Sequence, residues 1–263
     1  MSADMTVLRR DWLPEDLAPL LGGHGLDASV VVQARANEAE TDFLLSLAER
    51  HEWIAGVVGW TDLRAGDLER RLERRAEAAK LAGFRHQVQD EPDAAAFLAD
   101  SRFRRGVQAL QSRSLVYEVL VFASQLAAVP DFCAACDRHW IVLDHLGKPA
   151  IADGGFEVWR KQVTPLRGMP RVQCKLSGLV TEAMNDEGEL DPGDLRRYFD
   201  AALEIFGPER LMFGSDWPVC LLAADYAEVV DLVTQWAAAL SAGERDAIWG
   251  ETAVRTYALT GES

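Results

Sequence analysis

The sequence predicts an α/β fold on a parallel sheet, a (β/α)8 TIM barrel whose first strand is missing. Short, continuously apolar runs alternate with helical segments, which is typical of strands covered by helices on both faces. The chain has 263 residues, the usual size of one such barrel. Because we find no repeat, low-complexity tract or linker, we expect a single domain over residues 1–263.

Seven apolar runs are expected to form the strands, and they are rich in β-branched residues. They cover residues 29–33, 54–60, 83–88, 116–122, 140–145, 172–177 and 210–215. A closed barrel needs an eighth strand. The segment before Ser29 favours a helix over residues 13–21, with proline near its start. Either the sheet is open, or the first strand is absent from this chain.

Helical patterns fill the gaps between these runs. They cover residues 39–50, 63–81, 194–206, 226–240 and 244–257. The Glu/Arg run inside 63–81 is expected to form a solvated face with i,i+4 ion pairs. Gly207-Pro208 is a good stop for the helix before it.

Composition and charge exclude several classes of function. The net charge is -15, which argues against nucleic acid because its phosphates would be repelled. No apolar run approaches the roughly 20 residues that span a bilayer, and the first residues contain no signal-like apolar stretch, so we expect a cytoplasmic protein. Cys133 and Cys136 have CxxC spacing, but they lie in an apolar helical segment and are expected to be packing residues.

Two residues at strand ends are the main catalytic candidates. Asp216 follows the last strand, where a carboxylate can bind a metal or take a proton from water. The alternative is that it caps the next helix. His145 ends the fifth strand, where an imidazole can bind metal, hold a water or polarise a carbonyl. The alternative is a histidine that is hydrogen-bonded inside a loop.

Four further residues are expected to bind substrate. Arg85 and His86 form a polar cluster at the end of the third strand. Lys175 ends an apolar strand, and because a lone buried lysine is costly it should face the pocket mouth or a carboxylate. Trp217 offers an apolar wall to a sugar or planar ring, with core packing as the equal alternative.

Three motifs together resemble the amidohydrolase-related (amidohydrolase 2) family. They are Asp144-His145-Leu146-Gly147-Lys148-Pro149, residues 174–179 and residues 213–218. The resemblance is closest to the L-fuconolactonase and L-rhamnonolactonase type of sugar-lactone hydrolases, which residues 83–92 fit as well. It runs from about Asp11 to Leu259.

The resemblance implies a (β/α)8 barrel of amidohydrolase type with its site at the C-terminal face. It implies that Asp216 activates the hydrolytic water, and that His145 helps to bind a metal or the substrate carbonyl. One divalent metal such as zinc would then be bound by Asp216 and His145, although some members of the family work without one. The family's His-x-His at the end of the first strand is absent here. The missing motif would lie at the end of the missing strand, so a single absent segment accounts for both. In a full-length relative we expect that segment upstream of Leu8.

The expected function is therefore hydrolysis of a sugar-acid lactone, L-fuconolactone-like, by attack of water on the ring carbonyl. One alternative is another amidohydrolase activity on a pyrone or an aromatic acid, by hydrolysis or decarboxylation. A dicarboxylate substrate would require several arginines at strand ends, and only Arg85 is placed there. The other alternative is a truncated, inactive barrel. The expected partner is a small-molecule substrate, and we expect binding to neither nucleic acid nor membranes. The sequence is also compatible with a homo-oligomer.

Overall fold

A computed structural model of the chain describes residues 3–184 and 192–259. Its sheet has seven parallel strands in the order β1 to β7, each paired with its neighbour in sequence. They are β1 Ser29–Val32, β2 Ile54–Gly59, β3 Leu81–Gln87, β4 Val116–Leu120, β5 Ile141–Leu143, β6 Val172–Leu176 and β7 Leu211–Phe213. All seven strands expected from the sequence are confirmed.

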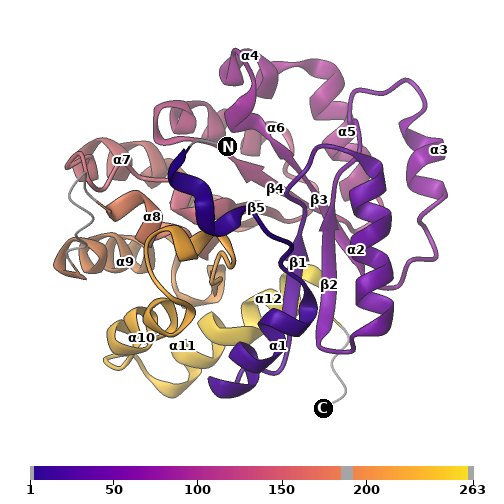
Figure 1. Ribbon diagram of the computed structural model, residues 1–263. Helices are drawn as coiled ribbons and strands as arrows, with labels where there is room; N and C mark the ends of the chain where they lie inside the picture. The colour runs from indigo at the N-terminus through magenta and orange to yellow at the C-terminus, as the bar shows by residue number, and fades with distance from the viewer. Residues whose placement is uncertain (1–2, 185–191, 260–263) are drawn as a thin grey trace.

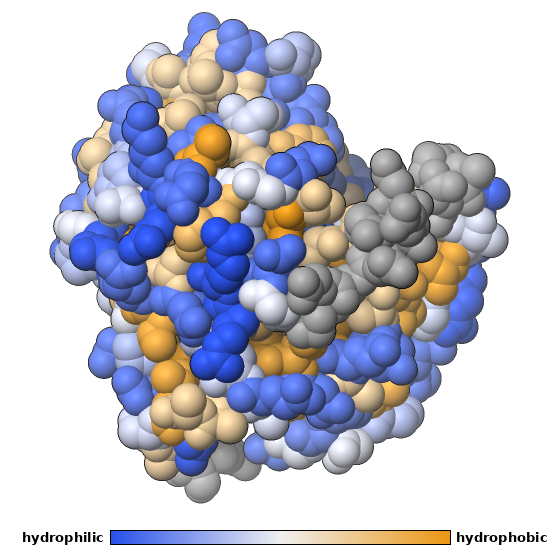
Figure 2. Space-filling model, turned by 90° about the vertical axis from the view of Figure 1, so that its left-hand side faces the viewer, coloured by the Kyte–Doolittle hydropathy of each residue, from blue (hydrophilic) through white to orange (hydrophobic). Residues whose placement is uncertain are grey.

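The sheet is curled, and helices surround it, as in a TIM barrel (Figure 1). The helices are α1 Pro14–Gly23, α2 Glu38–Arg50, α3 Leu68–Glu73, α4 Ala94–Ala99, α5 Ser101–Gln111, α6 Val129–Ala135, α7 Phe156–Val163, α8 Leu179–Ala183, α9 Pro192–Phe206, α10 Tyr226–Ala237, α11 Ala242–Asp246 and α12 Thr252–Tyr257. Parallel strands with helical crossovers bury both sheet faces, which explains the continuously apolar runs. The α7–α10 side shows hydrophilic residues mixed with small apolar patches (Figure 2).

The two faces of the sheet have different cores. The outer face joins the large helix-covered cluster that includes Phe84, Tyr117 and Leu143. The inner face carries a smaller apolar layer, closed by Tyr257 from α12. That layer consists of Val58, Ala82, Val116, Val142, Met212 and Tyr257. The barrel interior is therefore filled with side chains at its N-terminal end.

Above this apolar layer the interior becomes charged. Glu118 follows the inward-facing Val116 by two residues, and Asp144 follows the inward-facing Val142 by two residues. Because side chains two residues apart on a strand face the same side, both carboxylates face inward as well. Arg85 lies directly opposite Glu118 in the β3–β4 register, and Lys175 lies opposite Met212 between β6 and β7. Barrel interiors are dominated by bulky branched residues. A layer of four charges near the strands' C-terminal ends therefore marks this end as the functional one.

The strands β1 and β7 form the two edges of the seven-stranded sheet in the described part of the chain. Trp249, in a π turn at Ala247–Glu251, packs on Phe213 of β7 with ring centroids 4.4 Å apart. Leu17 and Leu20 of α1 join the same apolar cluster as Phe213. Helical segments from both ends of the chain thus lie against the last strand.

Two helix expectations are wrong in extent. The helix expected over 63–81 is only α3, Leu68–Glu73, and β3 already begins at Leu81. Its arginines also do not simply face water, because Arg71, Arg74 and Arg75 converge on Glu38 of α2. The helix expected over 244–257 is interrupted by the π turn between α11 and α12. No helix among the described residues is long and apolar enough to cross a membrane.

Candidate active site

The turn after β7 places Asp216 at the C-terminal face of the sheet. Asp216 has a left-handed backbone with φ +56°, which is uncommon for residues other than glycine, although aspartate adopts it more readily than most. Its backbone carbonyl accepts a hydrogen bond from the Cys220 amide at 2.9 Å, which closes the turn. Because strained backbone persists only where its surroundings impose it, this turn holds the carboxylate in a defined direction.

The turn after β5 holds His145 in an equally unusual way. Residues 145–148 all have positive φ, between 49° and 74°. Gly178, between β6 and α8, packs against the imidazole so closely that an added Cβ would lie 2.7 Å from Nδ1 of His145. Gly178 also has φ +67°, so both its space and its conformation require glycine. The chain therefore fixes the ring of His145 from two sides.

His145 and Asp216 face each other. Nε2 of His145 lies 3.8 Å from Oδ1 of Asp216, and Nδ1 lies 2.8 Å from the hydroxyl oxygen of Ser177. Burial lowers the pKa of His145 below its usual value, although Asp216 and Asp144 oppose this. A lowered pKa favours the neutral form of the ring. When the Ser177 hydroxyl donates to Nδ1, Nε2 carries the proton and points it into the site.

A layer of buried charges lies beside this pair. The Arg85 guanidinium donates to Asp144 at 2.9 Å, and Nζ of Lys175 lies 2.8 Å from the other oxygen of Asp144. The same ammonium lies 2.7 Å from Glu118, whose second oxygen accepts a hydrogen bond from Tyr257. Glu118 and Asp144 have no solvent exposure. Lys175 thus faces two carboxylates, those of Glu118 and Asp144, where the sequence predicted a carboxylate or the pocket mouth.

Burial and neighbouring charges push the two carboxyl pKa values apart. Burial opposes ionisation of Asp144, but the charges of Lys175 and Arg85 outweigh it and hold its pKa well below the usual value. For Glu118, burial and the nearby Asp144 raise the pKa in spite of Lys175 and Arg85. The pKa of Lys175 is raised because the two carboxylates outweigh its burial. The layer therefore keeps Asp144 and Lys175 charged.

His86 makes its side-chain contacts with residues other than His145 and Asp216. Its Nδ1 accepts a hydrogen bond from the Trp60 indole at 3.2 Å, and its Nε2 lies 2.7 Å from Glu91. Its ring stacks on Phe97 with centroids 4.6 Å apart. Both ring nitrogens are therefore engaged with side chains that follow β2 and β3.

Trp217 stands next to Asp216 and is half-buried. Its ring packs edge-on against Trp12, with centroids 5.1 Å apart, and the Arg10 guanidinium covers Trp12 at 3.5 Å. Trp217 is thus one end of an aromatic wall beside the carboxylate.

Sequence reasoning missed several residues of the site. Glu118 stands as one acid in an apolar strand, a signal that was available. Ser177 and Gly178 follow β6 directly, but their contacts with His145 cross between distant segments. Tyr257 comes from the last helix and reaches Glu118 across 139 positions, which no local pattern shows.

The expected metal ligands supply only part of a zinc site. His145 and Asp216 are suitable donors, but a catalytic zinc takes three protein ligands. Within residues 3–184 and 192–259, no group of three or more His, Cys, Asp or Glu side chains is arranged to hold a metal. Cys133 and Cys136 are buried and free, and burial raises the pKa of Cys136 to about 11. They pack in the core, as expected.

The chain is similar to two lactonases and to a solved amidohydrolase. The chain is 55% identical to an L-fucono-1,5-lactonase of Burkholderia multivorans, over 98% of this chain and 90% of that protein. It is 36% identical to an L-fucono-1,5-lactonase of Burkholderia ambifaria, over 85% of this chain and 76% of that protein. A crystal structure of an amidohydrolase from Burkholderia multivorans with bound zinc superposes with a TM-score of 0.94, at 54% identity over 98% of this chain and 93% of the other.

The family itself follows from a match along almost the whole chain. The model of the amidohydrolase family matches residues 1–259, which include all seven strands and both the His145 and Asp216 turns. The chain belongs to the amidohydrolase family.

Proposed function

We propose that this chain hydrolyses sugar-acid lactones of the L-fucono-1,5-lactone kind. The observation that carries the proposal is the pair of fixed side chains, Nε2 of His145 and Oδ1 of Asp216, 3.8 Å apart at the C-terminal face of the sheet. A base and a neutral imidazole at that separation suit attack of water on a carbonyl. The 55% identity to an L-fucono-1,5-lactonase supports the substrate class.

In the proposed reaction, Asp216 takes a proton from water as the water oxygen bonds to the lactone carbonyl carbon. The Nε2–H of His145 donates to the carbonyl oxygen, which becomes the oxyanion of the tetrahedral intermediate. Ser177 keeps that tautomer by donating to Nδ1. Collapse of the intermediate breaks the bond to the ring oxygen and releases a hydroxy acid.

We propose Trp217, His86, Arg85 and Lys175 as the residues that contact the substrate. Trp217 offers a ring face beside Asp216. His86 offers the edge of its ring, since both nitrogens are engaged. An ammonium has three donors, so Lys175 keeps one N–H beyond its two carboxylates. Nε of Arg85 is buried without a hydrogen-bond partner, which leaves that donor for a ligand.

The rival activities are less well supported. A pyrone dicarboxylate needs free arginines, and Arg85 is already paired with Asp144. We expect a pH-indicator panel to show acid release from L-fucono-1,5-lactone and related sugar lactones, but not from a pyrone dicarboxylate. An aromatic acid incubated in parallel should release no carbon dioxide. Conversion of the pyrone or the aromatic acid, with all lactones at the spontaneous rate, would contradict the proposal.

We further propose that His145 and Asp216 can bind one divalent ion, zinc, in a state separate from the reaction above, because Nε2 of His145 cannot bind a metal while it carries the proton that it donates to the substrate. A bound zinc supplies Lewis-acid polarisation of a carbonyl. Because two protein ligands hold zinc less tightly than three, we expect equilibrium dialysis to load about one zinc per chain and a chelator to strip it readily. Elemental analysis should show that His145→Ala and Asp216→Ala lose this zinc while Cys133→Ala keeps it. Equal zinc in all four proteins would contradict the assignment.

Three broader proposals accompany this activity. We propose that residues 1–263 act as one amidohydrolase domain. All four cysteines are free, which favours the reducing cytoplasm as its location. The edge strand β1 carries backbone groups that favour association, so we propose a homo-oligomer.

A further inference from the structure

Phe122 follows β4 and faces the interior of the barrel at its C-terminal end. Along β4, Val116 belongs to the inner apolar layer and Glu118 to the charge layer above it. Val119 and Val121 belong instead to the outer core. Side chains alternate along extended backbone, and Phe122 is extended with φ -82° and ψ 160°, so its ring faces inward as Val116 and Glu118 do. Phe122 is 42% exposed, which leaves much of its ring surface open to a ligand.

The backbone of Phe122 is held in place by the loop that follows it. Its amide donates to Oε1 of Gln125 at 2.9 Å, and its carbonyl accepts from the Gln125 amide at 2.9 Å. Nε2 of Gln125 in turn donates to the carbonyl of Gln89 at 3.2 Å, in the loop after β3. Two neighbouring loops therefore fix this residue. A ring on a fixed backbone is a prepared surface, because little of it has to be ordered when a ligand binds.

Lys148 brings a cation to this ring from the turn that holds His145. Its amide donates to the His145 carbonyl at 2.8 Å, and its ammonium lies 5.0 Å from the ring centroid of Phe122. Gly147 packs this turn against the loop after β4, since an added Cβ there would lie 2.7 Å from Cδ1 of Leu126. No carboxylate of the described residues lies within ion-pair distance of the ammonium. Its three N–H donors are therefore not taken up by an ion pair.

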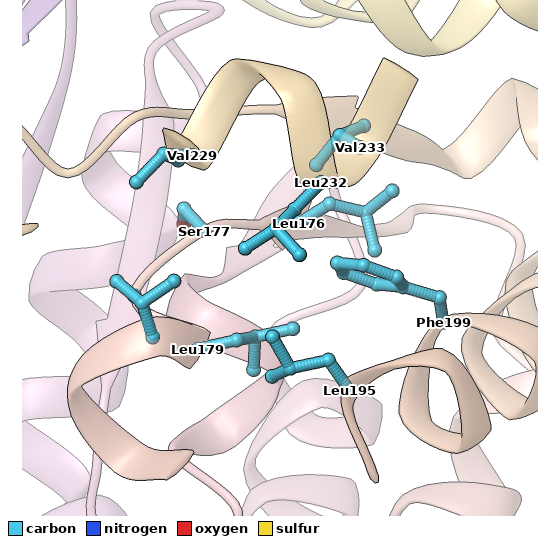
Figure 3. A pocket seen from close by; sticks show the side chains of 10 residues that line it. Leu176, Ser177, Leu179, Leu195, Phe199, Val229, Leu232 and Val233 are labelled. Atoms are coloured by element: carbon cyan, nitrogen blue, oxygen red, sulfur yellow. The ribbon is translucent and has the colours of Figure 1, made fainter. Parts of the chain in front are cut away.

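Behind Ser177 there is no room for a substrate. The hydroxyl oxygen of Ser177 lies 2.8 Å from Nδ1 of His145, and the residue borders a cavity between β6, α8, α9 and α10 (Figure 3). Leu179, Phe199 and Val233 are among the apolar side chains that line it. Its free volume is about 20 Å³, which is room for one water molecule and not for a lactone ring. A lactone bound at His145 therefore extends toward the mouth of the barrel, where the aromatic ring and the ammonium lie.

We propose that Phe122 and Lys148 form a platform that selects hydroxylated lactones over unsubstituted ones. The proposal rests on the lactonase function above and names what recognises its substrate class. The C–H groups on one face of the sugar ring pack on the exposed surface of Phe122. The ammonium of Lys148 donates a charge-assisted hydrogen bond to a hydroxyl group of that ring. An aromatic surface beside a cation fits a ring that is apolar on its face and polar at its rim.

The test compares L-fucono-1,5-lactone with δ-valerolactone, a six-membered lactone without hydroxyl groups. The measured quantity is the ratio of kcat/KM for the sugar lactone to kcat/KM for δ-valerolactone. We expect Lys148→Met to lower this ratio about 10-fold, the effect of losing one hydrogen bond to a charged group. Phe122→Leu, which keeps an apolar side chain but removes the flat ring, should lower it about 3- to 10-fold. Lys161→Met, at an exposed position of α7, is the matched control and should leave the ratio at its wild-type value.

Binding of L-fucono-1,5-lactam separates this proposal from the function on which it rests. The lactam keeps the hydroxyl groups of the ring and resists hydrolysis, so calorimetry measures its affinity without turnover. If wild type turns over neither lactone, the proposed hydrolysis fails, but a dissociation constant about 10-fold higher in Lys148→Met than in wild type still supports the platform. A wild-type ratio in both Lys148→Met and Phe122→Leu overturns the platform. Where no ratio can be measured, equal lactam affinities, or no binding by wild type, overturn it.

Discussion

Asp216→Asn is expected to lower kcat for sugar-lactone hydrolysis by about two to four orders of magnitude, the usual cost of losing a general base. The amide keeps the shape of the carboxylate but cannot accept the proton of the attacking water. The fold should survive, because the carboxylate makes no hydrogen bond with any described residue. Its one polar contact among those residues is with His145, at 3.8 Å. Steady-state kinetics with a pH indicator, together with a thermal melt, measure both quantities.

The matched control is Asp231→Asn, which changes an exposed aspartate on α10. It removes the same charge far from the reacting atoms, so its kcat should equal that of wild type. A value of kcat in Asp216→Asn within about threefold of wild type would refute the role of Asp216. A large loss of thermal stability in the same variant would instead indicate a structural role.

Lys175→Met is expected to cause the largest loss of stability, about 3–5 kcal/mol in the free energy of unfolding. The ammonium is the shared partner of two fully buried carboxylates, Glu118 at 2.7 Å and Asp144 at 2.8 Å. Among the described residues, removing it leaves Glu118 paired with Tyr257 alone and Asp144 paired with Arg85. Urea denaturation followed by circular dichroism measures the change.

The pH dependence gives this loss a specific signature. In the variant, Glu118 has lost its cation, so burial raises its pKa still further above that of the unfolded chain. A carboxyl with a raised folded pKa destabilises the fold as pH rises above its unfolded pKa of about 4.3. The deficit relative to wild type should therefore be larger at about pH 8 than at about pH 4.5.

Two comparisons separate the buried charge from the mere loss of a lysine. Adding Glu118→Gln to Lys175→Met removes the stranded carboxylate and should restore part of the stability. Lys161→Met, at an exposed position of α7, should change the unfolding free energy by less than about 0.5 kcal/mol. Equal stability losses in Lys161→Met and Lys175→Met would contradict the structural account of the charge layer.

The strands could be predicted from the sequence because each is buried on both faces. Continuous apolar runs such as residues 54–59 carry that signal within six positions. The helix over 63–81 was overextended because its charged pattern is compatible with a long solvated helix. Local sequence does not show that Arg71 and Arg75 leave that pattern to pair with Glu38, more than thirty positions away.

The two main residues of the site could be predicted from the sequence, but the buried charges beside them could not. Asp216 and His145 each follow a strand, and parallel strands bring their C-terminal ends to one edge, so their meeting follows from the fold. The charge layer depends on the register of four neighbouring strands, three of which carry Arg85, Glu118 and Lys175, while Asp144 directly follows β5.

The most direct test of the proposed reaction is hydrolysis of L-fucono-1,5-lactone by the wild-type chain in ¹⁸O-labelled water, read by mass spectrometry of the product. We expect enzyme-dependent turnover that places one labelled oxygen in the carboxylate of the hydroxy acid, because water activated by Asp216 attacks the carbonyl carbon. Label in the hydroxyl group would contradict attack at the carbonyl. Incorporation at the rate of an enzyme-free control would contradict the lactonase function itself.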